Sequence, residues 1–78
     1  MRNKFAKRVR RNLLRDNVEF ISERRVNTND KENLYEVVLV SHGIKLTITG
    51  SDRLDAMHRA LRGHLIVGAF KRSQEPRH

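Results

Sequence analysis

The chain has 78 residues, no cysteine and a formal net charge of +8. This length accommodates one domain, whose small core stabilises the fold only modestly. Without cysteine, neither a disulfide nor a thiolate metal site can add stability. The remaining routes are close packing, a binding partner or dimerisation, so a homodimer is one of our expectations.

The longest uninterrupted apolar run is residues 65–70, which is far too short to span a bilayer. No apolar segment follows the charged start of the chain, as a secretory signal would require. The basic N-terminal segment has only a short apolar face and no tryptophan, which disfavours insertion into a membrane surface. We therefore predict a cytoplasmic protein without a membrane partner.

The positive charge is concentrated at the N-terminus. Residues 1–15 carry seven Lys/Arg and no acid, whereas residues 16–78 carry ten Lys/Arg and nine Asp/Glu. An excess of one sign in one segment indicates a polyanionic partner or an acidic protein surface.

Residues 3–16 have the periodicity of a helix. Phe5, Ala6, Val9 and Leu13 fall within an arc of about 100°, which is the width of a normal core-facing stripe. Lys4, Lys7, Arg8, Arg11 and Arg15 occupy the opposite arc, where Leu14 is the one apolar exception.

Three strands follow. Residues 17–27 alternate imperfectly, with Val18, Phe20 and Val26 expected on one face and Glu19, Ile21, Glu23 and Arg25 on the other. Residues 27–33 are polar and predict an exposed hairpin loop. Residues 34–41 are rich in β-branched side chains, His42-Gly43 predicts a tight turn, and residues 44–49 alternate cleanly with one polar face.

A second helix is predicted to start near Ser51 as N-cap, with Gly63 as the residue that ends it. Residues 65–70 could continue the helix or form a short fourth strand, and we favour the strand or an extended segment. The expected fold is an α+β domain of order α-β-β-β-α over residues 1–70, in which a three-stranded antiparallel meander packs on helices. Residues 71–78 are expected to form a polar tail.

The sequence contains no nucleotide-binding loop, nucleophile elbow or dinucleotide fingerprint. His58 and His64 are six residues apart, a spacing that does not place two metal ligands on one helical face. His58 lies one turn from Asp55, which is typical of a surface pair. We therefore predict a non-enzymatic protein with no metal and no cofactor.

The α-β-β-β-α order over residues 3–64 resembles the double-stranded RNA-binding domain. That family usually opens its second helix with lysines that contact phosphates. Here Ser51-Asp52-Arg53-Leu54-Asp55 stands at that place. The resemblance therefore carries over a phosphate contact at Arg53 alone.

Tyr35-Glu36-Val37 through Gly43, followed by Ile48-Thr49-Gly50-Ser51-Asp52 and a helix, is similar in layout to small phage-encoded inhibitors of host machinery. These include anti-CRISPR proteins and inhibitors of RNA polymerase. The resemblance implies a non-enzymatic protein that occupies a surface of its target.

Two functional hypotheses follow. The first is a nucleic-acid-binding protein, for DNA or RNA, that contacts the phosphate backbone with low sequence specificity. Its predicted binding residues are Lys4, Lys7, Arg8, Arg11, Arg15, Arg24 and Arg25. The second is an inhibitor or adaptor that binds an acidic surface or a sheet edge of a host protein complex, such as a CRISPR effector or RNA polymerase.

Overall fold

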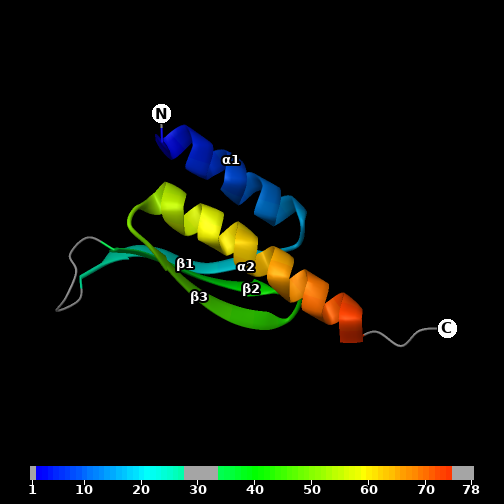
Figure 1. Ribbon diagram of the computed structural model, residues 1–78. Helices are drawn as coiled ribbons and strands as arrows, with labels where there is room; N and C mark the ends of the chain where they lie inside the picture. The colour runs from blue at the N-terminus through cyan, green and yellow to red at the C-terminus, as the bar shows by residue number, and fades with distance from the viewer. Residues whose placement is uncertain (1, 28–33, 75–78) are drawn as a thin grey trace.

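The computed structural model describes residues 2–27 and 34–74 (Figure 1). Its elements are α1 (Arg2–Arg15), β1 (Glu19–Val26), β2 (Leu34–Ser41), β3 (Ile44–Gly50) and α2 (Arg53–Gln74). The predicted α-β-β-β-α order is confirmed. Residues 28–33, most of the predicted hairpin loop, lie outside the described residues.

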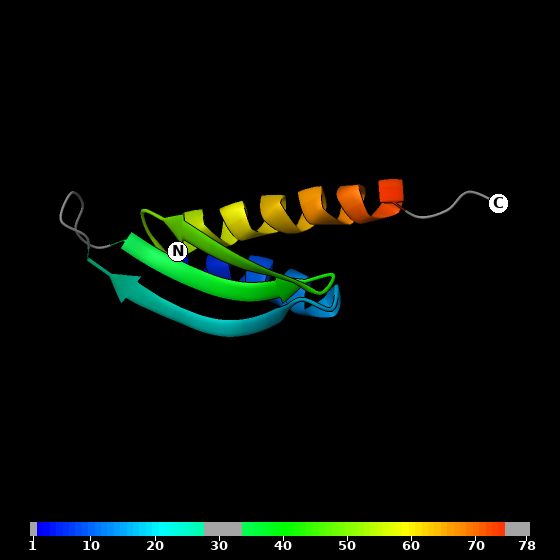
Figure 2. The same cartoon turned by 90° about the horizontal axis from the view of Figure 1, so that it is seen from below.

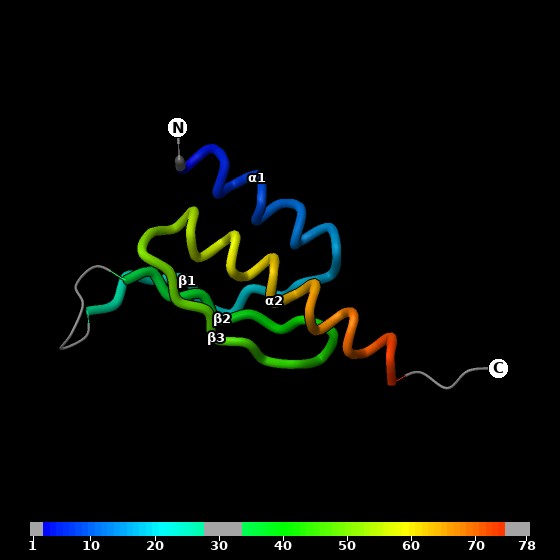
Figure 3. The backbone as a smooth tube through the Cα atoms, viewed as in Figure 1, coloured from blue at the N-terminus to red at the C-terminus, as the bar shows by residue number. Residues whose placement is uncertain are grey.

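The three strands form one antiparallel sheet in the order β1-β2-β3. Both helices cover the same face of this sheet (Figure 2), where α2 packs on β2 and β3 and α1 packs beside α2. The helices run in the same direction, so their N-termini lie at the same end of the molecule (Figure 3). No described element covers the opposite face, where Lys45, Thr47 and Thr49 of β3 are exposed, as the alternation in this strand predicts.

The core lies between the helices and the sheet. Its buried apolar residues are Ala6, Leu13, Val18, Val37, Leu39, Ala56, Met57 and Ala60. On α1 the predicted stripe is confirmed at Ala6 and Leu13, and Val9 packs against them. Phe5 is 48% exposed, so its predicted place in the core is wrong. It lies about 75° from the centre of the stripe at 100° per residue, and the Arg8 guanidinium lies 5.8 Å from its ring.

A bulge in β1 changes the predicted faces of this strand. Phe20 pairs with Leu39 and Ser22 pairs with Val38, which leaves Ile21 as the extra residue. The extra residue shifts the alternation, so Glu23 faces the helices with Phe20. The prediction that placed Glu23 opposite Phe20 is therefore wrong.

The end of α1 is fixed by its backbone. The N–H of Val18 donates to the carbonyl of Leu13 at 3.1 Å and the N–H of Asn17 donates to that of Leu14 at 3.2 Å. Asn17 has a φ of 64°, which makes this a Schellman cap with asparagine in the left-handed position. The cap turns the chain towards β1 and places Asp16 beside α2.

The predicted turn at His42-Gly43 joins β2 to β3, and both residues have positive φ, 49° and 79°. Two left-handed residues in a two-residue hairpin are typical of a type I′ turn.

At the start of α2, the cap is Asp52 and not the predicted Ser51. The Asp52 carboxylate accepts the N–H of Asp55 at 2.8 Å, and the Asp55 carboxylate accepts the N–H of Ser51 at 2.9 Å. Gly50 lies directly against this first turn, because a Cβ there would come within 2.5 Å of the backbone nitrogen of Ala56.

The predicted end of α2 at Gly63 is wrong, and so is the extended segment favoured for residues 65–70. The helix runs to Gln74, into the predicted tail. Gly63 and Gly68 serve packing within the helix: a Cβ on Gly63 would lie 3.5 Å from side chains of β3, and one on Gly68 would lie 3.0 Å from the His42 ring. In the part of the chain described, no helix has the length and apolar character needed to cross a membrane.

Candidate functional site

The exposed side of α1 carries the cations that the sequence singled out. We call Lys4, Lys7, Arg8, Arg11 and Arg15 the basic ridge. All five are exposed, and they lie opposite the core stripe within an arc of about 100°. Lys4, Lys7, Arg8 and Arg11 together line a shallow hollow. Within residues 2–27 and 34–74, no ion pair joins the basic ridge to a carboxylate.

A second groove lies where α1 meets the start of α2. It is lined by Lys7, Arg10, Arg11, Leu14 and Arg53, and we call it the Arg53 groove. Lys7 and Arg11 belong to both surfaces, so the ridge and the groove are continuous. Leu14, the apolar exception in the sequence pattern, contributes an apolar wall and is 45% exposed.

Next to the Arg53 groove, the carboxylate of Glu23 on β1 contacts side chains of α1, β2 and α2. It accepts a hydrogen bond from Arg10 Nε at 2.7 Å and from the Tyr35 hydroxyl at 3.3 Å. Arg53 Nη2 lies 3.6 Å from the same carboxylate. Burial, followed by the nearby charge of Glu23, raises the pKa of Tyr35 above its ordinary value. One acid thus connects α1, the sheet and α2.

Arg10 and Arg53 differ from the ridge cations because they are partly neutralised by Glu23. The Arg10 guanidinium also lies 4.7 Å from the centre of the Phe20 ring, a cation–π contact. Arg53 Nε is buried and has no hydrogen-bond partner within the described residues. An unpaired buried donor is costly. The rest of the Arg53 side chain, which is 26% exposed, lines the Arg53 groove.

The structure separates Arg24 and Arg25 from the basic ridge and from each other. Arg24 is on the open sheet face, where its Nε lies 3.2 Å from the Glu36 carboxylate. Arg25 pairs with Tyr35 in the β1–β2 register and is exposed on the helix side of the sheet. Both remain accessible, but only Arg25 is on the side of the sheet that carries the two helices.

A polar chain of three side chains lies near the opposite end of α1. The Ser41 hydroxyl lies 2.6 Å from His64 Nδ1, and His64 Nε2 lies 2.5 Å from the Asp16 carboxylate. With Nε2–H donated to the carboxylate, Nδ1 accepts the serine hydroxyl. The hydrogen bond and positive charge that His64 can offer lower the pKa of Asp16 below its ordinary 3.8. His42 stacks on His64 with ring centroids 5.0 Å apart.

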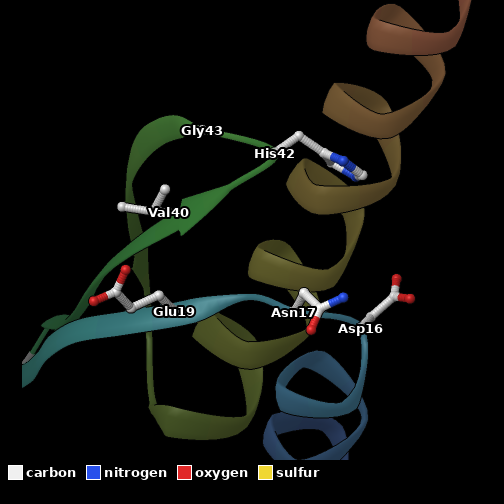
Figure 4. Close-up of a pocket in the computed structure, with 6 residues that line it drawn as sticks. All are labelled: Asp16, Asn17, Glu19, Val40, His42 and Gly43. Carbon is white, nitrogen blue, oxygen red and sulfur yellow. The ribbon is translucent and has the colours of Figure 1, made fainter.

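Serine, histidine and aspartate are the residue types of a hydrolytic triad, but here the serine and the histidine are buried in the core. Ser41 is completely buried and His64 is only 3% exposed, so the serine hydroxyl has no access to a substrate. The adjoining hollow is lined by Asp16, Asn17, Glu19, Val40, His42 and Gly43 (Figure 4). In this view the His42 ring points towards α2. Within the described residues, no group of three His, Cys, Asp or Glu side chains is arranged to hold a metal ion.

Sequence reasoning missed Arg10 and Glu23 as parts of the site, as well as the Ser41–His64–Asp16 chain. It singled out Arg53 only through the resemblance to the double-stranded RNA-binding domain, from its position at the start of the second helix. Glu23 had none, because the bulge at Ile21 turns it towards the helices.

Comparison of the chain with protein-family models found no family that matches it. Comparisons with curated proteins and with solved structures found no significant match.

Proposed function

We propose that the chain binds the phosphate backbone of nucleic acid, without catalysing a reaction, through the basic ridge and the Arg53 groove. The observation that carries this proposal is the set of five exposed cations on α1 for which the described residues supply no carboxylate. Like charges one turn apart destabilise a helix. A ligand that brings phosphates to this surface relieves that repulsion and releases its own counterions.

The surroundings of the ridge favour an anion further. The N-termini of both helices lie at the end of the molecule where the ridge begins (Figure 3), and each contributes a partial positive charge. Arg53, whose side chain is 26% exposed, adds a further guanidinium at the groove. The groove and the ridge together offer phosphates one continuous basic surface.

We propose that this binding has low sequence specificity, and the distribution of aromatic side chains supports that part of the proposal. Phe20 and Tyr35 are half-buried on the helix side of the sheet, and no aromatic side chain lies on the described part of the open face. The open face therefore offers no platform on which single-stranded bases could stack. Phosphate contacts position a protein on its ligand but carry little information about base sequence.

The test is a fluorescence-anisotropy titration with a labelled 20-base-pair DNA duplex, the equivalent RNA duplex and one single strand. If four ridge cations each contact a phosphate, affinity for DNA falls on the order of 100-fold between 50 and 200 mM salt. Lys7→Gln and Arg11→Gln should each reduce the slope of log affinity against log salt by about one.

Lys45→Gln is the matched control, because Lys45 is an exposed cation on the open sheet face. It should leave both the affinity and the slope nearly unchanged. Absence of binding at 50 mM salt, or equal effects of the control and ridge variants, would refute the proposal. Equally tight binding of polyglutamate with the same number of charges would instead favour an acidic protein surface as the ligand.

A further inference from the structure

The outer side of the last turns of α2 is apolar. Leu65, Ile66 and Phe70 are 57%, 69% and 56% exposed. The 22 residues of α2 extend about 33 Å, whereas strands of seven or eight residues extend about 25 Å. The end of the helix therefore projects past the sheet (Figure 2), where no described part of the chain covers it.

The residues of this surface follow a simple pattern along the helix. At 100° per residue, Arg62, Ile66, Ala69, Phe70 and Ser73 fall within an arc of about 100°, and Leu65 lies about 40° beyond it. The buried residues His64 and Gly68 lie on the opposite side. We call this arc, together with Leu65, the outer face of α2.

We propose that the outer face of α2 is the contact surface of a homodimer, in which two copies of α2 cross antiparallel with Ile66 at the two-fold axis. Arg62, Ile66 and Phe70 are spaced four residues apart, so the pattern is complementary to itself when one copy is reversed. Ile66 then meets its counterpart, and the Arg62 guanidinium of each chain lies over the Phe70 ring of the other. A two-fold contact requires such self-complementarity.

The proposed dimer requires an arginine guanidinium over a phenylalanine ring, and such contacts already occur within one molecule. Arg10 lies over Phe20 and Arg8 lies over Phe5 within one molecule. The same pairing of Arg62 with Phe70 would place each cation against a ring and away from the second cation. Lys71 and Arg72 lie about 120° or more from Ile66 around the helix, outside the contact.

The area available is close to what a specific dimer needs. The exposed parts of Leu65, Ile66 and Phe70 amount to roughly 350–400 Å² per chain, given typical side-chain areas and these exposed fractions. Two copies would bury at most roughly 750 Å² from these residues, because Leu65 lies about 100° from Ile66 around the helix. The neighbouring side chains would have to supply the remainder of the ~1,000 Å² at which specific interfaces begin.

Charge distinguishes this association from the proposed nucleic-acid binding. Each chain carries +8, so two copies repel at low salt, and screening should strengthen the dimer. Binding of phosphates has the opposite dependence on salt. The inference does not rest on the proposed function, and either can fail without the other.

The test is sedimentation equilibrium of the nuclease-treated full chain, over concentrations from 5 µM to 1 mM at 50 and 300 mM salt. We expect a reversible monomer–dimer equilibrium that is tighter at high salt. Ile66→Glu should weaken it by at least about 100-fold, which is the effect of losing a central interface residue. Lys71→Glu, off the outer face on the same helix, should not weaken it, and circular dichroism checks that both variants are folded.

Because the chain has no cysteine, single substitutions also locate the axis. Under mild oxidation Ile66→Cys should form a disulfide-linked dimer several times faster than Ser73→Cys, since only residues at the axis approach their own counterparts. A chain that stays monomeric at 1 mM, or a dimer insensitive to Ile66→Glu, overturns the proposal. Equal cross-linking at both positions does the same, and so does a chain that is monomeric in solution but binds vesicles containing 30% phosphatidylserine.

Discussion

The hydrogen bond between Ser41 and His64 yields the sharpest test of the core. Ser41→Ala removes the hydroxyl that pairs with His64 Nδ1 at 2.6 Å and leaves that nitrogen buried, since His64 is 3% exposed. An unsatisfied buried acceptor costs about 1–3 kcal/mol, whereas the loss of one hydroxyl changes the packed volume little. We expect the free energy of unfolding to fall by that amount and Tm to drop about 4–8 °C per kcal/mol.

The assay is urea unfolding at pH 7, followed by circular dichroism, of the parent chain, Ser41→Ala, His64→Leu and the double variant. With leucine at position 64 the serine hydroxyl has lost its partner, so removing it should cost nothing or stabilise the fold. The cycle should therefore return a coupling free energy of about 1–3 kcal/mol. If Ser41→Ala costs the same in both backgrounds, the hydrogen bond does not contribute as argued.

Two further predictions concern Asp16 and Gly50. The pKa of Asp16 is lowered below 3.8 in the fold by its hydrogen bond to His64, so its contribution is complete above pH 3.8 and is lost as the pH falls through the folded-state pKa. Asp16→Asn should thus lower the urea midpoint at pH 7, and the gap to the parent should narrow below pH 4; a gap independent of pH contradicts this. Gly50→Ala should destabilise by about 1–3 kcal/mol, because its Cβ would meet the backbone of Ala56 at 2.5 Å. Gly63→Ala, whose Cβ would meet flexible side chains at 3.5 Å, should be neutral or stabilising, and equal losses in the two thermal melts would count against the packing argument.

Local patterns in the sequence predicted most of the fold. The strand predicted over residues 34–41 has the same bounds as β2 in the structure. The turn predicted at His42-Gly43 is also confirmed, and both of its residues have positive φ. The errors occur where tertiary contacts override local signals. Gly63 was predicted to end the second helix, but the helix continues because β3 packs against this small residue, as His42 does against Gly68.

The site was less predictable than the fold, because charge counting identifies cations but not their partners. The excess on residues 1–15 correctly pointed to an exposed basic face on α1. It could not show that Arg10 turns away to Glu23, a pairing that depends on a bulge at Ile21. The contact between Asp16 and His64 spans 48 residues, a separation at which no sequence period operates.

For phosphate binding, the number of cations on a surface matters less than the number that have no carboxylate partner. Arg10 and Arg53 sit in the Arg53 groove, yet both face Glu23, so a phosphate that enters must compete with that carboxylate. The cations of the basic ridge face no such competitor in the described residues. A phosphate should therefore bind the ridge first. The groove should contribute only if Arg53 exchanges its 3.6 Å contact with the Glu23 carboxylate for a shorter contact with the phosphate. Under the proposed function, the ridge should accordingly set the salt dependence of binding, while Glu23 should limit what the groove adds to affinity.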